Sequence, residues 1–362
     1  MMTDSRCYGL DLFRLTAMVM ITAIHINMEY FVLVSSWEKS IWLTGWLIQN
    51  ICFAGVNCFA LLTGYLARET RISFDKKWFS RIFDLWAKVV IFGLLIYFPV
   101  LYLLPDIEFR WRAIYYIFCV RGGVLWYIGA YLGLLVFLPF ISGFTARFSV
   151  REQALFCLIS FGLFSVLTIT NSVPESFHLA KGYSMIWLII CYLWGQALRA
   201  AAPMILKWKF STLVLLAGAV AGIAVPFFYL ITTGGWRLMN YVSPFFVLEA
   251  ACLLLLFSKI QIKGEKTKKV LKFLSTYSLG IYLLQAQHVV WFDFLCKKNR
   301  FPEEPLQILW KFPAMILGTS IIGVLVYFLS SKIYSIRIFS WIRDFIYSVF
   351  VEKFLKFLIR EK

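Results

Sequence analysis

The stretch GLDLFRLTAMVMITAIHINMEYF, residues 9–31, decides how the rest of the chain is interpreted. It is long and apolar enough to cross a bilayer as a helix. It nevertheless contains four ionisable residues, Asp11, Arg14, His25 and Glu29. Because an ionisable side chain is costly at bilayer depth, these residues are candidates for a functional site.

Arg14 and His25 lie on one face of this predicted helix. They are eleven residues apart, which is roughly three turns plus about 20° of rotation, and about 16 Å along the helix axis. Glu29 follows one turn after His25, and Asp11 lies about one turn before Arg14. We interpret His25 as a catalytic or proton-handling residue. For Asp11 and Arg14 there is a simpler alternative, because charges near the start of a spanning helix can snorkel to the interface.

The composition indicates an all-α polytopic membrane protein rather than a soluble domain. Of 362 residues, 61% are hydrophobic and only 15% are charged. The net charge of +17 could suggest nucleic-acid binding in a soluble protein. Here the basic residues lie between apolar runs, which the positive-inside rule explains better. The eight cysteines show no metal-ligand spacing, so we expect neither a metal site nor a disulfide framework.

Apolar runs of about 20 residues predict ten spanning helices in a single domain of residues 1–333. The tail, residues 334–362, alternates apolar and basic residues, which predicts an amphipathic helix on the membrane surface. With ten spans, most of the 36 basic residues fall on the side of the two termini, which places both termini in the cytoplasm. The predicted spans are 9–31, 41–66, 79–103, 123–144, 153–171, 184–200, 210–231, 240–258, 272–294 and 308–331.

A dense group of cations follows the second predicted span. Arg68, Arg71, Lys76 and Lys77 lie within ten residues of one another, directly after Tyr65. Guanidinium groups match phosphate geometry, so these five residues are candidates for binding a phosphate-bearing cofactor. The alternative is a topology signal that also attracts anionic lipids.

Polar and aromatic residues near the opposite ends of the spans are candidates for binding a second substrate. Trp126 and Tyr127 are suited to stacking, although an aromatic belt at the interface would explain them equally well. Tyr241 lies near the same end of a later span. Arg121 and His288 could likewise be interfacial, whereas Glu249 is a second acid at membrane depth.

Five motifs resemble those of the integral-membrane acyltransferase-3 family, in particular its bacterial surface-polysaccharide O-acetyltransferases such as those that act on the enterobacterial common antigen. The first motif contains an arginine and, eleven residues later, a histidine, here Arg14 and His25. The resemblance covers nearly the whole chain. In order, the motifs are GLDLFRLTAMVMITAIH (9–25), GVNCFALLTGYL (55–66), VLWYIGAYLGLLVFLPFI (124–141), NYVSPFFVLEA (240–250) and YSLGIYLLQ (277–285).

The resemblance implies transfer of an acyl group, usually acetyl, from cytoplasmic acyl-CoA to a hydroxyl of a surface glycan or its lipid-linked precursor. It also implies location in the bacterial cytoplasmic membrane, in contact with membrane lipids. Arg14, Arg68 and Arg71 would then bind the polyanionic acetyl-CoA. His25 would be the general base or a transient acyl acceptor, with Glu29 orienting it as a carboxylate does in a catalytic triad.

Two positions depart from the family pattern. Thr63 replaces a serine, and Gln285 replaces a common histidine. A glutamine cannot carry a proton as histidine does, but it can still form hydrogen bonds with a substrate.

Two other classes of protein remain as alternatives. One is a proton-coupled transporter or flippase for a lipid-linked sugar, with His25 and Glu249 as proton carriers, although no internal repeat is evident. The other is a membrane sensor or scaffold without chemistry, which the cost of buried charge disfavours.

Overall fold

The computed structural model describes residues 6–28, 39–67, 72–103, 125–170, 177–287 and 305–354, and within these ranges it is helical without strands. The elements most relevant to the site are α1, α3, α4, α6 and α14. The helices are α1 (Tyr8–Asn27), α2 (Lys39–Phe53), α3 (Gly55–Tyr65), α4 (Lys76–Leu103), α6 (Trp126–Ile141), α7 (Phe144–Arg147), α8 (Val150–Phe161), η2 (Gly162–Val166), α9 (Leu167–Thr170), η4 (Ala180–Gly182), α10 (Met185–Ile205), α11 (Ser211–Thr233), α12 (Pro244–Ser258), α13 (Glu265–Tyr277), α14 (Leu279–Gln285), α15 (Pro305–Tyr334), α16 (Arg337–Ile346) and η6 (Tyr347–Glu352).

Six helical segments of the described chain are long and apolar enough to cross a membrane, which confirms the predicted class of all-α membrane protein. Two more apolar helices, α6 and α12, are shorter. The predicted spans 153–171 and 272–294 coincide in part with broken helices, α8–η2–α9 and α13–α14. The count of ten spans therefore stays a prediction. The six segments are Tyr8–Asn27, Lys39–Tyr65, Lys76–Val100, Met185–Ile205, Ser211–Thr233 and Leu309–Tyr334.

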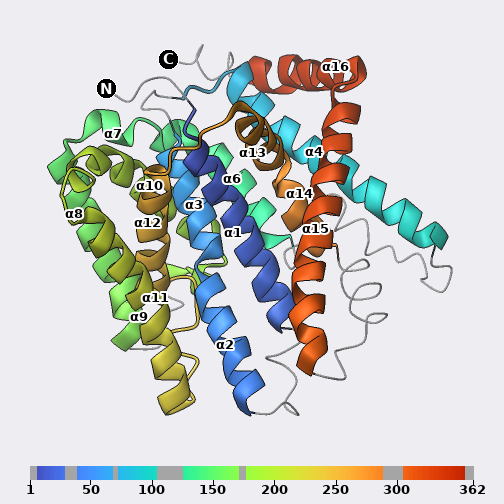
Figure 1. Cartoon of the computed structure of the whole chain (residues 1–362). Helices are drawn as coiled ribbons and strands as arrows, with labels where there is room; N and C mark the ends of the chain where they lie inside the picture. Colours follow the sequence, from blue (N-terminus) through green and yellow to red (C-terminus); the bar gives the residue numbers. More distant parts are fainter. Residues whose placement is uncertain are drawn as a thin grey trace.

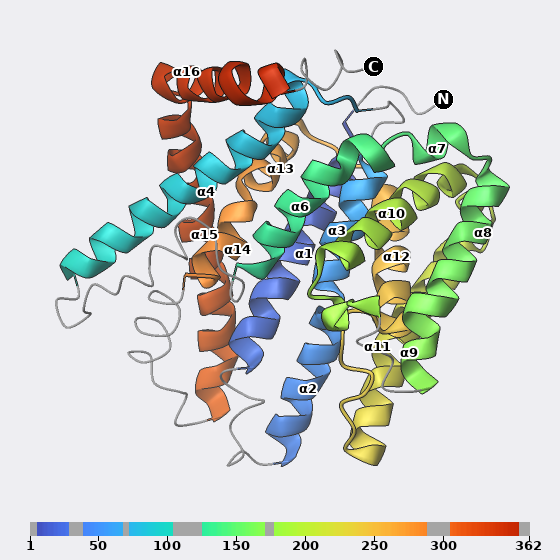
Figure 2. The same ribbon diagram turned by 180° about the vertical axis from the view of Figure 1, so that it is seen from behind.

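Helix α1 lies in the middle of the bundle. It contacts α2, α3 and α12 as well as α13, α14 and α15. Helices α8, α10, α11 and α12 lie to one side of it, and α4, α14 and α15 lie to the other (Figures 1 and 2). Helix α1 is apolar around most of its circumference, and such a helix is expected at the centre of a bundle. The segment with the ionisable residues is thus covered by protein on several sides.

Glycines allow the closest helix contacts, as expected in membrane bundles. A Cβ atom on Gly64 of α3 would overlap the backbone of Tyr192 in α10, and one on Gly195 of α10 would overlap the carbonyl of Leu61. Gly280 of α14 and Gly323 of α15 form a second pair that packs backbone to backbone. These contacts fix α3 and α14, which carry side chains of the candidate site.

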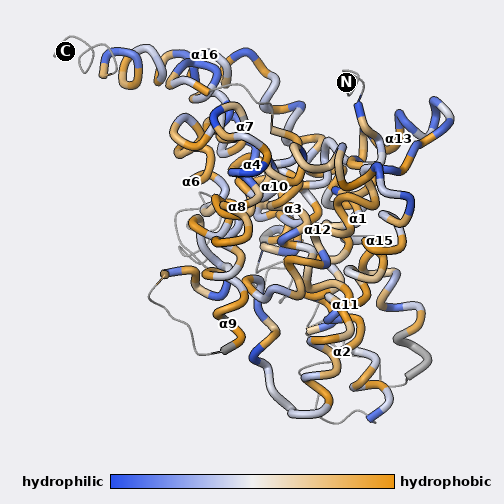
Figure 3. The backbone as a smooth tube through the Cα atoms, turned by 90° about the vertical axis from the view of Figure 1, so that its left-hand side faces the viewer, coloured by the Kyte–Doolittle hydropathy of each residue, from blue (hydrophilic) through white to orange (hydrophobic). Residues whose placement is uncertain are grey.

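Helix α16 lies across the end of the bundle at which α1 begins (Figure 1). Lys76 of α4 pairs with Asp344 at 2.9 Å, and Arg343 pairs with Asp84 at 3.3 Å. The hydrogen bond from Lys76 lowers the pKa of Asp344 below its usual value, and Arg343 adds to this shift. Trp341 is among the exposed apolar residues of α16. Figure 3 shows hydrophilic segments at this end, around α13, and a broad apolar zone through the middle of the bundle.

We expect Gly323→Ala to destabilise the protein. The new Cβ would lie 2.6 Å from the carbonyl oxygen of Gly280 and 2.7 Å from Cα of Ile281, an overpacking that costs about 1–3 kcal/mol. Gly318 lies on the same helix with open space around it, so Gly318→Ala should be neutral or stabilising, since alanine favours a helix by about 1 kcal/mol over glycine. Thermal unfolding in detergent measures both variants, and equal melting temperatures would contradict the backbone contact.

Candidate functional site

A cavity of about 910 Å³ opens among α1, α3, α4, α6 and the α13–α14 segment. Its walls include the last residues of α3, the first turns of α4 and the second half of α6. These parts lie at the end of the bundle that carries α16 (Figure 2). The volume is within the range of about 300–1,000 Å³ that is typical of small-molecule sites.

The polar wall of this cavity is cationic. Arg14 of α1 lines it, together with Lys77 and Arg81 of α4. Lys77 and Arg81 are four residues apart, so they lie on the same face of their helix. No aspartate or glutamate is among the described residues that line the cavity. An anionic ligand would therefore meet three positive charges without a competing carboxylate.

A chain of hydrogen bonds holds Arg14 in the cavity wall. Arg6 donates two hydrogen bonds to the buried carboxylate of Asp11, at 2.6 and 2.8 Å. The hydroxyl of Ser275 donates to the same carboxylate at 2.7 Å and accepts from Nη1 of Arg14 at 3.2 Å. Arg6 thus compensates the charge of Asp11, and Arg14 makes no ion pair within the described part of the chain. Its remaining N–H groups are available to a ligand.

His25 is fixed by Gln285, which comes from α14. Nδ1 of His25 lies 2.6 Å from Oε1 of Gln285. The amide nitrogen of Gln285 donates to the carbonyl of Ile281 at 3.1 Å and to the hydroxyl of Thr22 at 2.8 Å. Since a carbonyl can only accept, the amide cannot be turned around, and Oε1 must face the imidazole. Nδ1 therefore carries the proton of neutral His25, and Nε2 holds the free lone pair.

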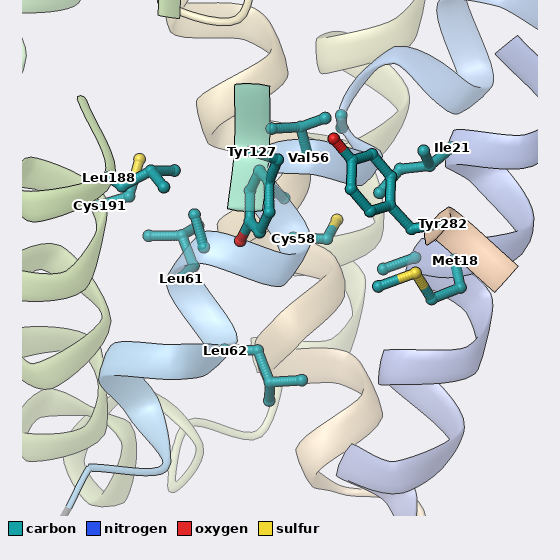
Figure 4. Packing of buried hydrophobic residues seen from close by; sticks show 14 of the residues in the cluster. Met18, Ile21, Val56, Cys58, Leu61, Leu62, Tyr127, Leu188, Cys191 and Tyr282 are labelled. Carbon is teal, nitrogen blue, oxygen red and sulfur yellow. The ribbon is translucent and has the colours of Figure 1, made fainter. Parts of the chain in front are cut away.

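His25 lines a narrow second pocket of about 10 Å³, beside the large cavity. The two spaces share Phe59, Tyr127 and Leu279 in their walls. Figure 4 shows the packing around this region, with Tyr282 near the side chains of α1 and Tyr127 near those of α3. The shared side chains form a common wall between the cationic cavity and the imidazole.

Trp126 and Tyr241, which the sequence suggested as substrate contacts, both line the pocket of His25. Their rings stack with centroids 6.1 Å apart. Helix α6 begins at Trp126, and Tyr241 lies just before α12. Residues from the first, third and fourth motifs are thus brought together, and Gln285 from the fifth joins them.

Three residues that the sequence predicted to contact a ligand line neither the large cavity nor the pocket of His25. Lys76 does not line the cavity, because it pairs with Asp344 on another face of α4. Tyr65 is buried and is not in the cavity wall. It follows Thr63, which does line the cavity, by two residues of α3, so its side chain points about 200° away from that of Thr63 around the helix. Glu249 is buried in α12 against Gly222 of α11 and lines neither space.

The remaining predicted residues lie outside the described part of the chain, and their roles stay predictions. They are Glu29, Arg68, Arg71, Arg121 and His288. Within the described part, the side chain that shares a hydrogen bond with the imidazole of His25 is that of Gln285. Sequence reasoning gave that orienting role to Glu29.

Several residues of the site were missed by the sequence analysis. Arg81 could have been found, because it follows Lys77 by one helical turn on a helix that begins with basic residues. Ser275 gave no comparable signal, since a serine in an apolar helix is a common packing residue. The sequence suggested Tyr127 for stacking beside Trp126, but not as part of the wall that the two spaces share. Their roles follow from the helices that face them.

Comparison with protein families matches residues 8–351 to the acyltransferase domain of the acyltransferase-3 type. The chain belongs to this family. Neither the comparison with curated proteins nor that with solved structures found a significant match. The family membership and the apolar helices together indicate a membrane acyltransferase. This favours acyl transfer over the transporter alternative, for which Glu249 would have had to act together with His25.

We expect Gln285→Leu to reduce acyl transfer about tenfold to a hundredfold. The change removes the acceptor that fixes the tautomer of His25 and leaves a buried N–H without a partner, a loss of about 1–3 kcal/mol. Gln285→Glu in its neutral, protonated form retains an acceptor for Nδ1 of His25 and one O–H donor in place of the amide N–H groups, and should be less impaired. Turnover at saturating donor, measured beside donor affinity, separates this effect from donor binding, which should not change. A normal turnover number for Gln285→Leu would contradict the orienting role.

Proposed function

We propose that this protein transfers an acyl group, in the first instance acetyl, from acyl-CoA to a hydroxyl of a cell-surface polysaccharide or its lipid-linked precursor. The observation that carries the proposal is the placement of His25. His25, whose Nε2 holds the free lone pair, lines a pocket that shares a wall with a cationic cavity of about 910 Å³. A general base and an anion-binding site are the two parts that acyl transfer from CoA requires.

The cavity suits the donor in charge and in size. Coenzyme A carries several phosphate oxygens, which Arg14, Lys77 and Arg81 can bind through charge-assisted hydrogen bonds. The hydroxyls of Thr63 and Thr276 lie in the same wall and can serve the remaining polar groups. The phosphates would occupy the cationic end, and the thioester arm would extend toward the wall shared with His25.

His25 performs the proton transfer in this scheme. Nε2 takes the proton of the acceptor hydroxyl while the oxygen attacks the thioester carbonyl. Collapse of the tetrahedral intermediate breaks the C–S bond, and the imidazolium returns the proton to the departing sulfur. Oε1 of Gln285, bonded to Nδ1, stabilises the transient positive charge.

A two-step scheme would use the same nitrogen as a nucleophile. Nε2 would attack the thioester, CoA would leave, and the acceptor hydroxyl would then take the acyl group from the imidazole. Exchange of labelled CoA into acetyl-CoA without any acceptor occurs only in this second scheme, so that measurement distinguishes the two.

The membrane topology belongs to the same proposal. The end of the bundle that carries α16 would face the cytoplasm, where acyl-CoA is found, with both termini on that side. Basic residues of α4 and α13 at this end support the assignment. The exposed apolar side chains of α16 would lie in the surface of the bacterial inner membrane.

We expect His25→Ala to lower the rate of acetyl transfer at least about a hundredfold, because general-base catalysis typically contributes 10²–10⁴-fold. The assay follows labelled acetyl from acetyl-CoA into the glycan and lipid fraction of membranes that contain the full-length protein. Donor affinity should stay within about twofold, since His25 does not line the large cavity. Unimpaired transfer by a well-expressed His25→Ala protein would remove the base from the mechanism.

We also expect Lys77→Ala and Arg81→Ala each to weaken CoA binding about tenfold, because each removes a charge-assisted contact with phosphate. Binding should also fall steeply with salt. Lys76→Ala is the matched control. It removes the same charge one residue away, but Lys76 pairs with Asp344 at the surface, where an ion pair contributes about 1 kcal/mol or less. Unchanged CoA binding in the Lys77 and Arg81 variants would assign these cations to topology alone, and equal losses in all three variants would assign the effect to net charge rather than to the cavity.

A further inference from the structure

Three aromatic rings form a cluster beside the pocket of His25. Trp126 and Tyr183 have ring centroids 4.7 Å apart, Tyr183 and Tyr241 are 4.9 Å apart, and Trp126 stacks on Tyr241 at 6.1 Å. We call Trp126, Tyr183 and Tyr241 the aromatic cluster. Nothing in the sequence had pointed to Tyr183.

The aromatic cluster connects the surface with the imidazole. Tyr183 is 48% exposed, whereas Tyr241 is only 3% exposed. Trp126 is half-buried between them and, like Tyr241, lines the pocket of His25. A flat molecule that stacked on Tyr183 would therefore be guided toward Nε2 of His25.

The segment that carries Tyr183 has an unusual backbone. His178, Ala180 and Lys181 all have positive φ angles, of 49°, 47° and 55°, and Gly182 follows at 96°. Non-glycine residues rarely adopt this region, and such conformations are concentrated at functional sites. A Cβ on Gly182 would overlap the Cβ of Tyr241 and lie 3.3 Å from the ring of Trp187. The strained segment is thus pressed directly against the aromatic cluster.

Hydrogen bonds hold Tyr241 from both sides of its peptide. Its N–H donates to the carbonyl of Lys181 at 3.1 Å. Its carbonyl accepts from Nδ2 of Asn57 at 2.8 Å, and Oδ1 of Asn57 accepts from the indole of Trp187 at 3.0 Å. An arrangement that links α3, α10 and the strained segment through one tyrosine holds the rings in fixed positions, as a binding site requires.

Unpaired polar atoms lie next to Tyr241 in the sequence. The hydroxyl of Ser243 has no hydrogen-bond partner although the residue is only 1% exposed, and Oδ1 of Asn240 is also buried without one. Ser243 is the N-cap residue of α12, but its side chain does not cap the helix, as a serine at that position usually does. Buried polar groups are almost always paired, so the chain on either side of Tyr241 departs from ordinary packing.

We propose that the aromatic cluster is the binding site of the acceptor and that it takes a sugar ring, with Tyr183 as the outermost contact. The apolar face of a pyranose would lie against the exposed parts of Tyr183 and Trp126, with one hydroxyl directed toward the pocket of His25. This inference rests on the proposed acyl transfer. A belt of interfacial aromatic residues would explain exposed rings alone, but it would not explain the strained backbone pressed against them.

The test titrates the acceptor against reconstituted full-length protein. The acceptor probe is an extract of polysaccharide and lipid-linked glycan from native cells in which the gene is deleted, and the donor is radiolabelled acetyl-CoA. We expect Tyr183→Ala to raise the apparent KM for the extract about two- to tenfold, as the loss of one aromatic contact predicts. The KM for acetyl-CoA should not change, and Tyr183→Phe should behave like the wild type.

Tyr102→Ala is the matched control, because Tyr102 is 87% exposed at the far end of α4 and is outside the aromatic cluster. Tyr183→Met keeps apolar volume without a ring and replaces Tyr183→Ala if the latter does not fold. An unchanged acceptor KM in the tyrosine 183 variants, or an equal effect of Tyr102→Ala, would overturn the site. Label found only in lipids without sugar would overturn the sugar assignment. No transfer by the wild type would instead overturn the proposed function.

Discussion

A polar side chain deep in a helix bundle has to find its hydrogen-bond partner within the protein, because the hydrocarbon around it offers none. In this protein that constraint decides the state of the candidate base. Gln285 can satisfy its own amide group only by donating to Ile281 and Thr22, and this leaves its oxygen for Nδ1 of His25. The tautomer of His25 is therefore a consequence of where α14 packs on α1. The backbone contact of Gly280 with Gly323 packs α14 against α15 and so helps to hold α14 in that position.

The two spaces of the site differ greatly in size, about 910 Å³ around Arg14 against about 10 Å³ at His25. Arg14, Lys77 and Arg81 line the larger one, which makes it suited to an anionic ligand. At about 10 Å³ the space at the imidazole has room for about one water molecule at most, so the proposed reaction requires a side chain in its wall to move. In that reaction a narrow centre would exclude water, which would otherwise compete with the acceptor hydroxyl for the thioester.

Local sequence determined much of the fold and part of the site. The apolar runs placed the helices, and the eleven-residue spacing of Arg14 and His25 identified the helix that lies at the centre of the bundle. The broken helices were not predicted, because hydropathy does not report where a backbone kinks. The partner of His25 could not be predicted either, since Gln285 is 260 residues away and the sequence offered Glu29 one turn along the same helix. Periodicity relates residues on one helix, but it does not say which faces of two helices meet.

The difference between Lys76 and Lys77 shows how the rotation of a helix decides which of its side chains line a cavity. On an α-helix, neighbouring residues point about 100° apart, so one rotation of α4 cannot place both lysines in the cavity. The packing of α4 on α15, α6 and α14 sets that rotation, and the pairs of Lys76 with Asp344 and of Asp84 with Arg343 lie on the side of α4 that faces α16. Lys77 and Arg81 are then turned into the cavity. Helix α16 lies outside the six long apolar segments, and its Asp344 pairs with the lysine of α4 that is turned away from the cavity. The cationic lining therefore depends on how α4 packs in the bundle, and the described residues of α16 are not part of it.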